Sequence, residues 1–460
     1  MRPCGARKAA TLTGPGESGR WRGLPTQFLS NAIPRRYVPH RAAWPIALTP
    51  PAIGPRIADP SASRPPGTSG RAAWAPAGDA GIGRLRVAHV SPAYFAEDSL
   101  IGGGERYVSY VARALRDASP SLPFVLAQSV FAIGRKDLAF SDGGVPVSVF
   151  ANESPSAHPM AAMSARLWQA LADVDVVHVH QALTFFGCYC AVIARSLNKT
   201  LVMTDLGGGE NPLLLQHGGL ALADGLLSIS DSARSLVGAY FRGPHAAIIG
   251  PVDTGAFAPP SGASASSGGR PREVLSVGRL LPHKGVDRII DALPPGLPLR
   301  LVGRPYDAEY FALLRERAAG KQVTFVVDAD DAALRQCYHA AGLYVHASTF
   351  IDCYGRRIAK PELMGLTTLE ALASGLPVAV ANTASLPELA PDPRFSRVFQ
   401  DVADLRGILE AFAAGTWPGP DAGDLARRHT VDNYSFPVVG RRIAAFYAEL
   451  HAARTAAARP

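Results

Sequence analysis

Short apolar runs alternate with stretches of helical periodicity along most of the chain beyond Leu85. Runs such as LRVAHVSP (85–92) and DVVHVH (175–180) are bounded by polar or glycine-containing segments, which is typical of buried strands. Stretches such as 101–115 instead place apolar residues three and four positions apart, as the buried face of a helix requires. This alternation predicts mainly parallel sheets covered by helices on both faces.

The predicted strands lie at 85–92, 123–129, 145–150, 175–180, 200–205, 225–230, 246–250, 273–279, 299–303, 323–327, 343–348 and 377–382. The predicted helices lie at 101–115, 160–171, 184–197, 285–293, 307–319, 330–341, 365–373 and 437–453.

The alternation is interrupted at APPSGASASSGGRPR (258–272), which is rich in Pro, Gly and Ser and has no apolar period. This interruption divides the chain into segments, which we predict as follows: a basic, Pro/Gly/Ala-rich disordered tail (1–83), an N-terminal Rossmann-like domain (84–257), a linker (258–272), a C-terminal Rossmann-like domain (273–430) and a C-terminal helix (431–460), a candidate to pack back on the N-terminal domain. Ligands of doubly wound sheets bind at the carboxyl ends of the strands, so the two domains are expected to face each other across a cleft.

The net charge of +8 belongs to the predicted tail. Residues 1–83 hold 11 Lys/Arg and 3 Asp/Glu; of the totals of 46 and 38, 35 basic and 35 acidic residues remain for the rest of the chain. The predicted domains are therefore neutral, and no nucleic-acid partner is expected. No apolar stretch reaches the roughly 18–20 residues that span a bilayer. Cys188 and Cys190 lack the second pair or the histidine of a zinc knuckle, so we expect free thiols in a reducing compartment.

Known nucleotide-binding patterns exclude several cofactors. The dinucleotide fingerprint fails, because Tyr107 stands where its third glycine belongs and no acid ends the next strand. The P-loop pattern is absent. Two Asp-x-Asp pairs, at 173–175 and 328–330, are better explained by a strand start and by the beginning of a helix. We therefore expect no cofactor and no metal ligand.

Two cations follow the strand at 273–279. Arg279 ends it and Lys284 stands in the loop before the next helix. A guanidinium can clamp two oxygens while an ammonium supplies a point charge, which suits a diphosphate. Alone, the pair is equally compatible with two solvated surface cations.

The segment KPELMGLTTLEALASGLPVAV (360–380) strengthens the diphosphate hypothesis. It predicts a loop with Glu362, and then a helix that begins near Gly365 and stops at Gly375. The amide groups of Gly365, Leu366 and Thr367 would be free to bind an anion. Glu370, about one turn into the helix, could accept hydrogen bonds from a ribose diol, while Glu362 could accept those of a group beyond the phosphate. This order predicts a nucleotide sugar.

At these residues the chain resembles the retaining GT-B glycosyltransferases of the family 4 type (glycosyl transferases group 1). Their Glu-x7-Glu motif is matched by Glu362 and Glu370. The resemblance runs from about Leu85 to Phe446 through ordered motifs: GGGERY (102–107), DVVHVH (175–180), SISDSA (228–233), GPVDTGAFAP (250–259), VGRLLPHKG (277–285), PELMGLTTLEALASGLPVAV (361–380) and SLPEL (385–389). It implies transfer of a sugar, with retention, from a nucleotide-diphosphate sugar to a saccharide or lipid-linked acceptor.

The resemblance also implies roles for individual residues. Arg279 and Lys284, with Gly278 beside them, would hold the diphosphate in place of a metal. Glu362 would contact the donor sugar and Glu370 the ribose. Gly103 and Gly104 would approach from the N-terminal domain. The family implies bacterial surface polysaccharide, lipopolysaccharide or glycolipid synthesis in the cytoplasm, with the inner face of the plasma membrane as a candidate peripheral site.

One family feature is replaced here. Many members carry a histidine after the strand at 200–205, where this chain has Leu206. Asp205 is our candidate to contact the donor or acceptor sugar in its place, and His180 is a second candidate. His339 and His346 are expected to be structural. A nucleotide-sugar epimerase and a non-catalytic GT-B partner subunit remain alternatives.

Overall fold

The computed structural model describes residues 83–94, 103–156, 158–207, 218–259 and 272–457. The predicted tail (1–83) and linker (258–272) fall almost entirely outside these ranges, as does Gly102 of the GGGERY motif. Within them, no helix combines the length and the apolar character needed to cross a membrane.

The first sheet has eight strands in the order β3-β4-β2-β1-β5-β6-β7-β8. Its strands are β1 (Arg84–Ser91), β2 (Val125–Gly134), β3 (Leu138–Asp142), β4 (Val145–Ala151), β5 (Val176–His180), β6 (Thr200–Thr204), β7 (Gly225–Ser228) and β8 (His245–Ala247). Its helices are α1 (Gly103–Ala118), α2 (Arg166–Ala170), α3 (Phe185–Ser196) and α5 (Asp231–Val237), with short 3-10 turns η1 (Ser119–Ser121), η2 (Pro159–Ala161) and η3 (Gly219–Leu222). All neighbouring pairs are parallel except β3 and β4.

The second sheet has six parallel strands in the order β11-β10-β9-β12-β13-β14. Its strands are β9 (Val274–Val277), β10 (Leu299–Val302), β11 (Val323–Val326), β12 (Leu343–His346), β13 (Val378–Ala381) and β14 (Ser396–Phe399). Its helices are α6 (Val286–Ala292), α7 (Ala308–Arg317), α8 (Asp331–Ala340), α9 (Leu366–Ala373) and α10 (Val402–Ala414), with η4 (Pro282–Lys284) and η5 (Leu386–Leu389). The predicted pair of mainly parallel α/β sheets is confirmed.

The helix predicted at 160–171 forms only in part. The turn η2 and the short helix α2 replace it, and residues 162–165 between them are not helical. The Glu153 carboxylate accepts hydrogen bonds from the Ser164 hydroxyl (3.0 Å) and the Ala165 amide (2.9 Å). Because these bonds hold the backbone in place, the helix begins only after Ala165.

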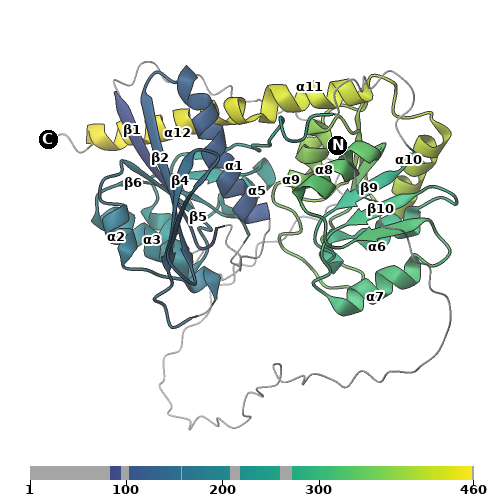
Figure 1. Cartoon of the computed structure of the whole chain (residues 1–460), viewed down its shortest axis with the longest axis horizontal. Helices are drawn as coiled ribbons and strands as arrows, with labels where there is room; N and C mark the ends of the chain where they lie inside the picture. Colours follow the sequence, from purple (N-terminus) through teal and green to yellow (C-terminus); the bar gives the residue numbers. More distant parts are fainter. Residues whose placement is uncertain (1–82, 95–102, 157, 208–217, 260–271, 458–460) are drawn as a thin grey trace, which may run out of the picture. The chain divides into compact units, whose positions relative to one another are not determined.

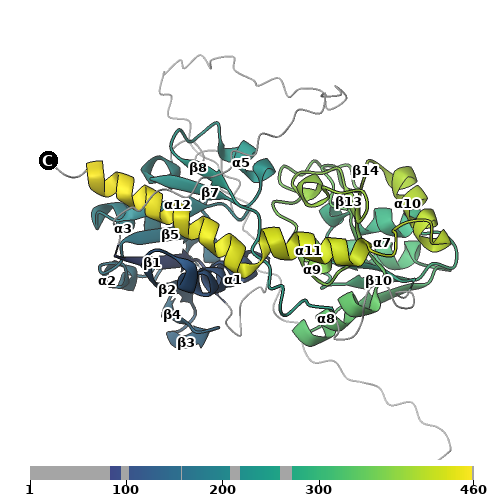
Figure 2. The ribbon, with the colours of Figure 1, turned by 90° about the horizontal axis from the view of Figure 1, so that it is seen from above.

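The chain ends in two helices, α11 (Ala422–Tyr434) and α12 (Phe436–Ala457). Figure 2 shows α12 lying along α1, over the first sheet. Gly440 permits this packing, because a Cβ there would overlap the carbonyl of Ala114 on α1. Apolar residues of α12, Ile443 and Phe446 among them, join the core of that sheet.

Candidate functional site

A cavity of about 360 Å³ lies at the carboxyl ends of strands from both sheets. Ten of the residues predicted for the site line it: Gly103, Gly104, Gly278, Arg279, Lys284, Glu362, Gly365, Leu366, Thr367 and Glu370. The two glutamates are therefore on one cavity, as their spacing predicts.

The loop after β9 supplies the two cations. Lys284, the last residue of η4, places its Nζ 2.8 Å from Oε2 of Glu362. Arg279 lines the same cavity and has no ion pair among the described residues. Since Lys284 is partly neutralised and Arg279 is not, the loop offers net positive charge to an anion.

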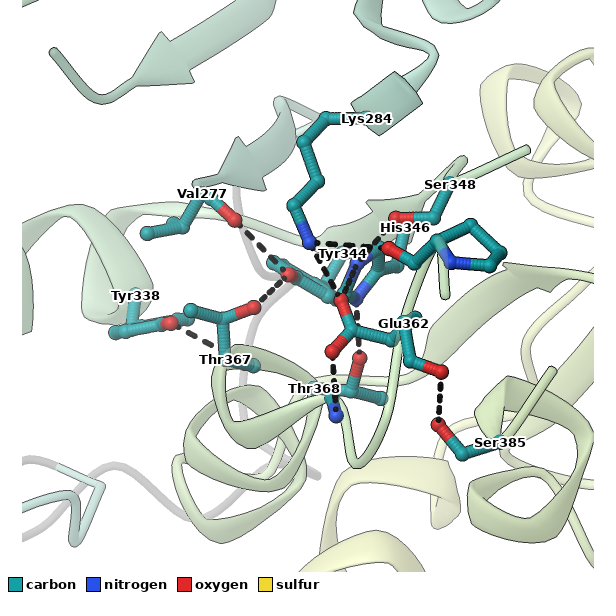
Figure 3. A network of polar contacts seen from close by, with 12 residues as sticks. Val277, Lys284, Tyr338, Tyr344, His346, Ser348, Glu362, Thr367, Thr368 and Ser385 are labelled. Atoms are coloured by element: carbon teal, nitrogen blue, oxygen red, sulfur yellow. Dashed lines mark hydrogen bonds and ion pairs between the residues drawn. The ribbon is translucent and has the colours of Figure 1, made fainter. Parts of the chain in front are cut away.

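Glu362 is the centre of the network in Figure 3. Its Oε2 contacts Lys284 and lies 3.0 Å from Nε2 of His346, the last residue of β12. Burial alone would raise the pKa of this carboxyl, but Lys284 and His346 outweigh it and hold the pKa well below its usual range. Nδ1 of His346 is in turn 2.9 Å from the Thr368 hydroxyl. Glu362 is therefore a fixed, ionised carboxylate that can accept hydrogen bonds from hydroxyl groups.

The start of α9 faces the cavity. Gly365 caps the helix with φ +84°, and an added Cβ would lie 2.9 Å from Leu389 Cδ1, so glycine is required on both grounds. The expectation that its amide is free needs correction, since that amide donates to Oε1 of Glu362 (3.1 Å). The amides of Leu366 and Thr367 lie in the first turn and lack intrahelical partners, so they remain available to an anion.

Glu370 lies one turn further along α9 and is 2% exposed. The Tyr338 hydroxyl donates to its Oε2 (2.9 Å). Burial raises the pKa of this carboxyl to about 7, although the Arg106 guanidinium and Tyr338 oppose the shift. Arg106 extends from α1 and also contacts Asp331 at the start of α8 (2.8 Å). Glu370 therefore titrates near neutral pH, unlike Glu362.

Two predicted residues lie away from the cavity wall. Asp205 follows β6, and its Oδ2 binds Nζ of Lys360 (2.8 Å), a residue that does line the cavity. Its influence on a ligand would thus pass through Lys360. His180 is fully buried, with its ring against Tyr107, so a sugar in the cavity would not reach it without rearrangement.

Sequence reasoning missed three residues of the cavity. Arg106 belongs to the GGGERY motif, in which only the glycines were considered. Lys360 stands two positions before Glu362, where its charge was the only signal. His346 was expected to be structural, yet it binds Glu362 directly.

Comparisons with known proteins agree with this geometry. Residues 263–394 match the family described as "Glycosyl transferases group 1". Over these residues the C-terminal α/β domain is similar to the domains of that family. The match covers both glutamates and both cations of the cavity.

Curated proteins are similar to this chain over part of their length. The lipopolysaccharide core biosynthesis mannosyltransferase LpsB of Rhizobium meliloti is 28% identical over 229 residues, 46% of this chain and 63% of that protein. The GDP-mannose-dependent alpha-(1-6)-phosphatidylinositol monomannoside mannosyltransferase of Mycolicibacterium smegmatis is 29% identical over 254 residues, 51% of this chain and 64% of that protein. The chain thus spans less than two thirds of the length of either relative.

Solved structures share the whole GT-B fold. Anabaena Alr3699/HepE in complex with UDP and glucose has a TM-score of 0.61 at 18% identity, covering 79% of this chain and 100% of that one. A glycosyltransferase from Rickettsia africae ESF-5 has a TM-score of 0.61 at 14% identity, covering 80% and 98%. The predicted GT-B architecture is therefore confirmed.

Proposed function

We propose that this protein is a retaining glycosyltransferase, which transfers a sugar from a nucleotide-diphosphate sugar to a saccharide or lipid-linked acceptor. The observation that carries the proposal is the placement of Glu362, ionised between Lys284 and His346, beside the N-terminus of α9. Glu370 lies one turn further along the same helix. In this arrangement Glu362 would accept hydrogen bonds from sugar hydroxyls, the first amides of α9 would donate to phosphates, and Glu370 would accept from a ribose.

In the proposed reaction the bond between the sugar and the diphosphate breaks, and the nucleotide diphosphate leaves with the electron pair. Arg279, Lys284 and the first amides of α9 stabilise the negative charge that develops on it, so no metal is needed. Such preorganised groups act strongly in a site that excludes water. Glu362 orients the sugar while the acceptor hydroxyl attacks the anomeric carbon from the same face. The new glycosidic bond forms as the hydroxyl proton passes to the departing diphosphate.

The acceptor class is supported by the relatives. Mannosyltransferases of lipopolysaccharide core and phosphatidylinositol mannoside synthesis are among them. We therefore propose a role in bacterial surface glycan or glycolipid assembly, in the cytoplasm, with peripheral association at a membrane that holds a lipid-linked acceptor. We propose uracil or guanine as the base of the donor, because one structural neighbour is solved with UDP and one relative is named as GDP-mannose-dependent.

The test begins with thermal stability in the presence of UDP, GDP and ADP, and continues with hydrolysis of the matching nucleotide sugars in the absence of acceptor. We expect one diphosphate to stabilise the protein and its sugar to be hydrolysed slowly. Arg279→Ala should abolish the stabilisation, while Arg315→Ala, on the exposed side of α7, should leave it unchanged. The proposal fails if no nucleotide diphosphate stabilises the protein and Arg279→Ala changes nothing.

The same assays separate the two alternatives. A non-catalytic partner subunit would bind the nucleotide diphosphate without hydrolysing any donor. An epimerase would convert the donor to a stereoisomer, which chromatography of the nucleotide-sugar pool would detect.

A further inference from the structure

Three imidazoles lie together in the first sheet, outside the cavity. His89 on β1 pairs in register with His178 on β5, and His180 follows two residues later on the same face. All three side chains have no exposed surface. The cluster lies beneath α12, whose Tyr447 hydroxyl is 2.6 Å from Nδ1 of His178.

The spacing of the ring nitrogens suits a tetrahedral metal ion. Nδ1 of His89 is 3.3 Å from Nε2 of His180, and one nitrogen from each of the three rings lies within 4.8 Å of the others. Zinc binds histidine nitrogen at about 2.0–2.1 Å, which places tetrahedral ligands about 3.4 Å apart. The pair formed by His89 and His180 already has about that separation.

Hydrogen bonding fixes the tautomer of His178. The Thr204 hydroxyl donates to the carbonyl of Leu227 (2.7 Å), so toward His178 Nε2, at 2.7 Å, it can only accept. Nε2 therefore carries the proton, and Nδ1 is unprotonated, with an electron pair that accepts from the Tyr447 hydroxyl. A metal-binding histidine is commonly held in this way, with its second nitrogen donating to an outer-shell oxygen.

The other two rings are left with unsatisfied atoms. Nε2 of His89, Nδ1 of His180 and the hydroxyl of Tyr107 have no hydrogen-bond partner among the described residues. The two nitrogens are those opposite the pair that lies 3.3 Å apart, so they would carry the protons when Nδ1 of His89 and Nε2 of His180 bind a metal.

We propose that His89, His178 and His180 form a structural binding site for one divalent transition-metal ion, with Zn²⁺ preferred for imidazole ligands. Tyr447, beside Nδ1 of His178, is the candidate fourth ligand through its oxygen, and would tie α12 to the sheet. The ion would lie outside the cavity proposed for sugar transfer, on the far side of Tyr107.

The test uses the full chain without a histidine tag, produced in zinc-supplemented medium and dialysed. Elemental analysis should find about one zinc ion per chain, as a closed three-histidine site requires. Protein unfolded with a chelator and refolded with Co²⁺ should show the visible absorption of four-coordinate cobalt. Less than about a tenth of an ion per chain, together with no cobalt spectrum after refolding, would overturn the proposal.

Variants locate the ion. His89→Gln with His180→Gln should lose the metal, whereas His158→Gln, at an exposed site, should keep it. Tyr447→Phe preserves the buried ring and should weaken metal binding or alter the cobalt spectrum. This variant tests the site if the double histidine variant fails to fold. If the variant with both His89→Gln and His180→Gln folds and keeps all of its metal, the ion binds elsewhere and the proposed site is refuted.

Discussion

Glu370 provides the sharpest test of the site, because its burial has a calculable effect on stability. Its pKa rises from 4.5 in the unfolded chain to about 7 in the folded one. Between these values the folded protein binds a proton that the unfolded chain has released, so the folded state loses stability as the pH rises. The shift of about 2.5 pKa units corresponds to roughly 3 kcal/mol of folding free energy. The folded protein loses this stability as the pH rises from 4.5 to 7, and the loss is complete above pH 7.

The perturbation is Glu370→Gln, which removes the charge and keeps an oxygen for the Tyr338 hydroxyl. Without bound nucleotide, the variant should be more stable than the wild type at pH 8 by up to about 3 kcal/mol. At pH 4.5 the two proteins should have almost the same free energy of unfolding. For a domain of 150–250 residues the difference at pH 8 is roughly 6–12 °C in melting temperature. Differential scanning calorimetry from pH 4.5 to 8.5, without nucleotide, measures the difference.

The control is Glu410→Gln, an exposed substitution on α10, whose difference from wild type should not change with pH. If the gap between Glu370→Gln and wild type stays constant over this range, the buried carboxyl does not titrate near pH 7. The same result would remove the basis for any pH effect on donor binding.

Four further outcomes follow from the site. Donor affinity of the wild type should strengthen from pH 6 to 8, as Glu370 ionises and accepts the ribose hydroxyls; titration calorimetry should find no such trend in Glu370→Gln. Glu362→Ala should lower kcat by at least about tenfold with a smaller change in KM, because it removes a contact to the reacting sugar. Gly365→Ala should destabilise the protein by about 1–3 kcal/mol in thermal melts, since its φ of +84° and the nearby Leu389 both oppose a Cβ. Lys360→Met should alter donor kinetics more than Asp205→Asn, because Lys360 itself lines the cavity, and the two effects should be non-additive, because both substitutions break one ion pair; additive effects would mean that Asp205 acts separately.

Much of the fold could be read from the sequence because parallel strands are continuous apolar runs. DVVHVH predicted β5, and VTFVV predicted β11, each within two residues. The strand β3 (LAFSD) was missed, since it is short, at the sheet edge and largely exposed, and so has no apolar run. The helix at 160–171 was overpredicted because its interruption comes from the distant side chain of Glu153.

The candidate site, too, could be predicted where its residues are close together in the sequence, and not where they are distant from one another. Glu362, Gly365 and Glu370 lie in nine consecutive positions, so their arrangement around one helix end follows from helical geometry alone. Even in this segment, the sequence did not predict the hydrogen bond that the Gly365 amide donates to the Glu362 carboxylate. A carboxylate can accept from a nearby backbone amide as readily as it binds a ligand.

The residues that set the charge state of the two glutamates are distant from them in sequence. Arg106, which opposes the rise in the pKa of Glu370, comes from helix α1, and Asp205 reaches the cavity through Lys360, 155 positions away. No periodicity or local motif encodes such pairs; they exist only once both sheets are folded. Glu362 and Glu370 are alike in the sequence and both buried, yet one has Lys284 and His346 against its oxygens while the other has a neutral phenol. The proposed division of labour, a permanently charged contact to the sugar and a titratable contact to the ribose, therefore rests on tertiary neighbours rather than on the Glu-x7-Glu spacing itself.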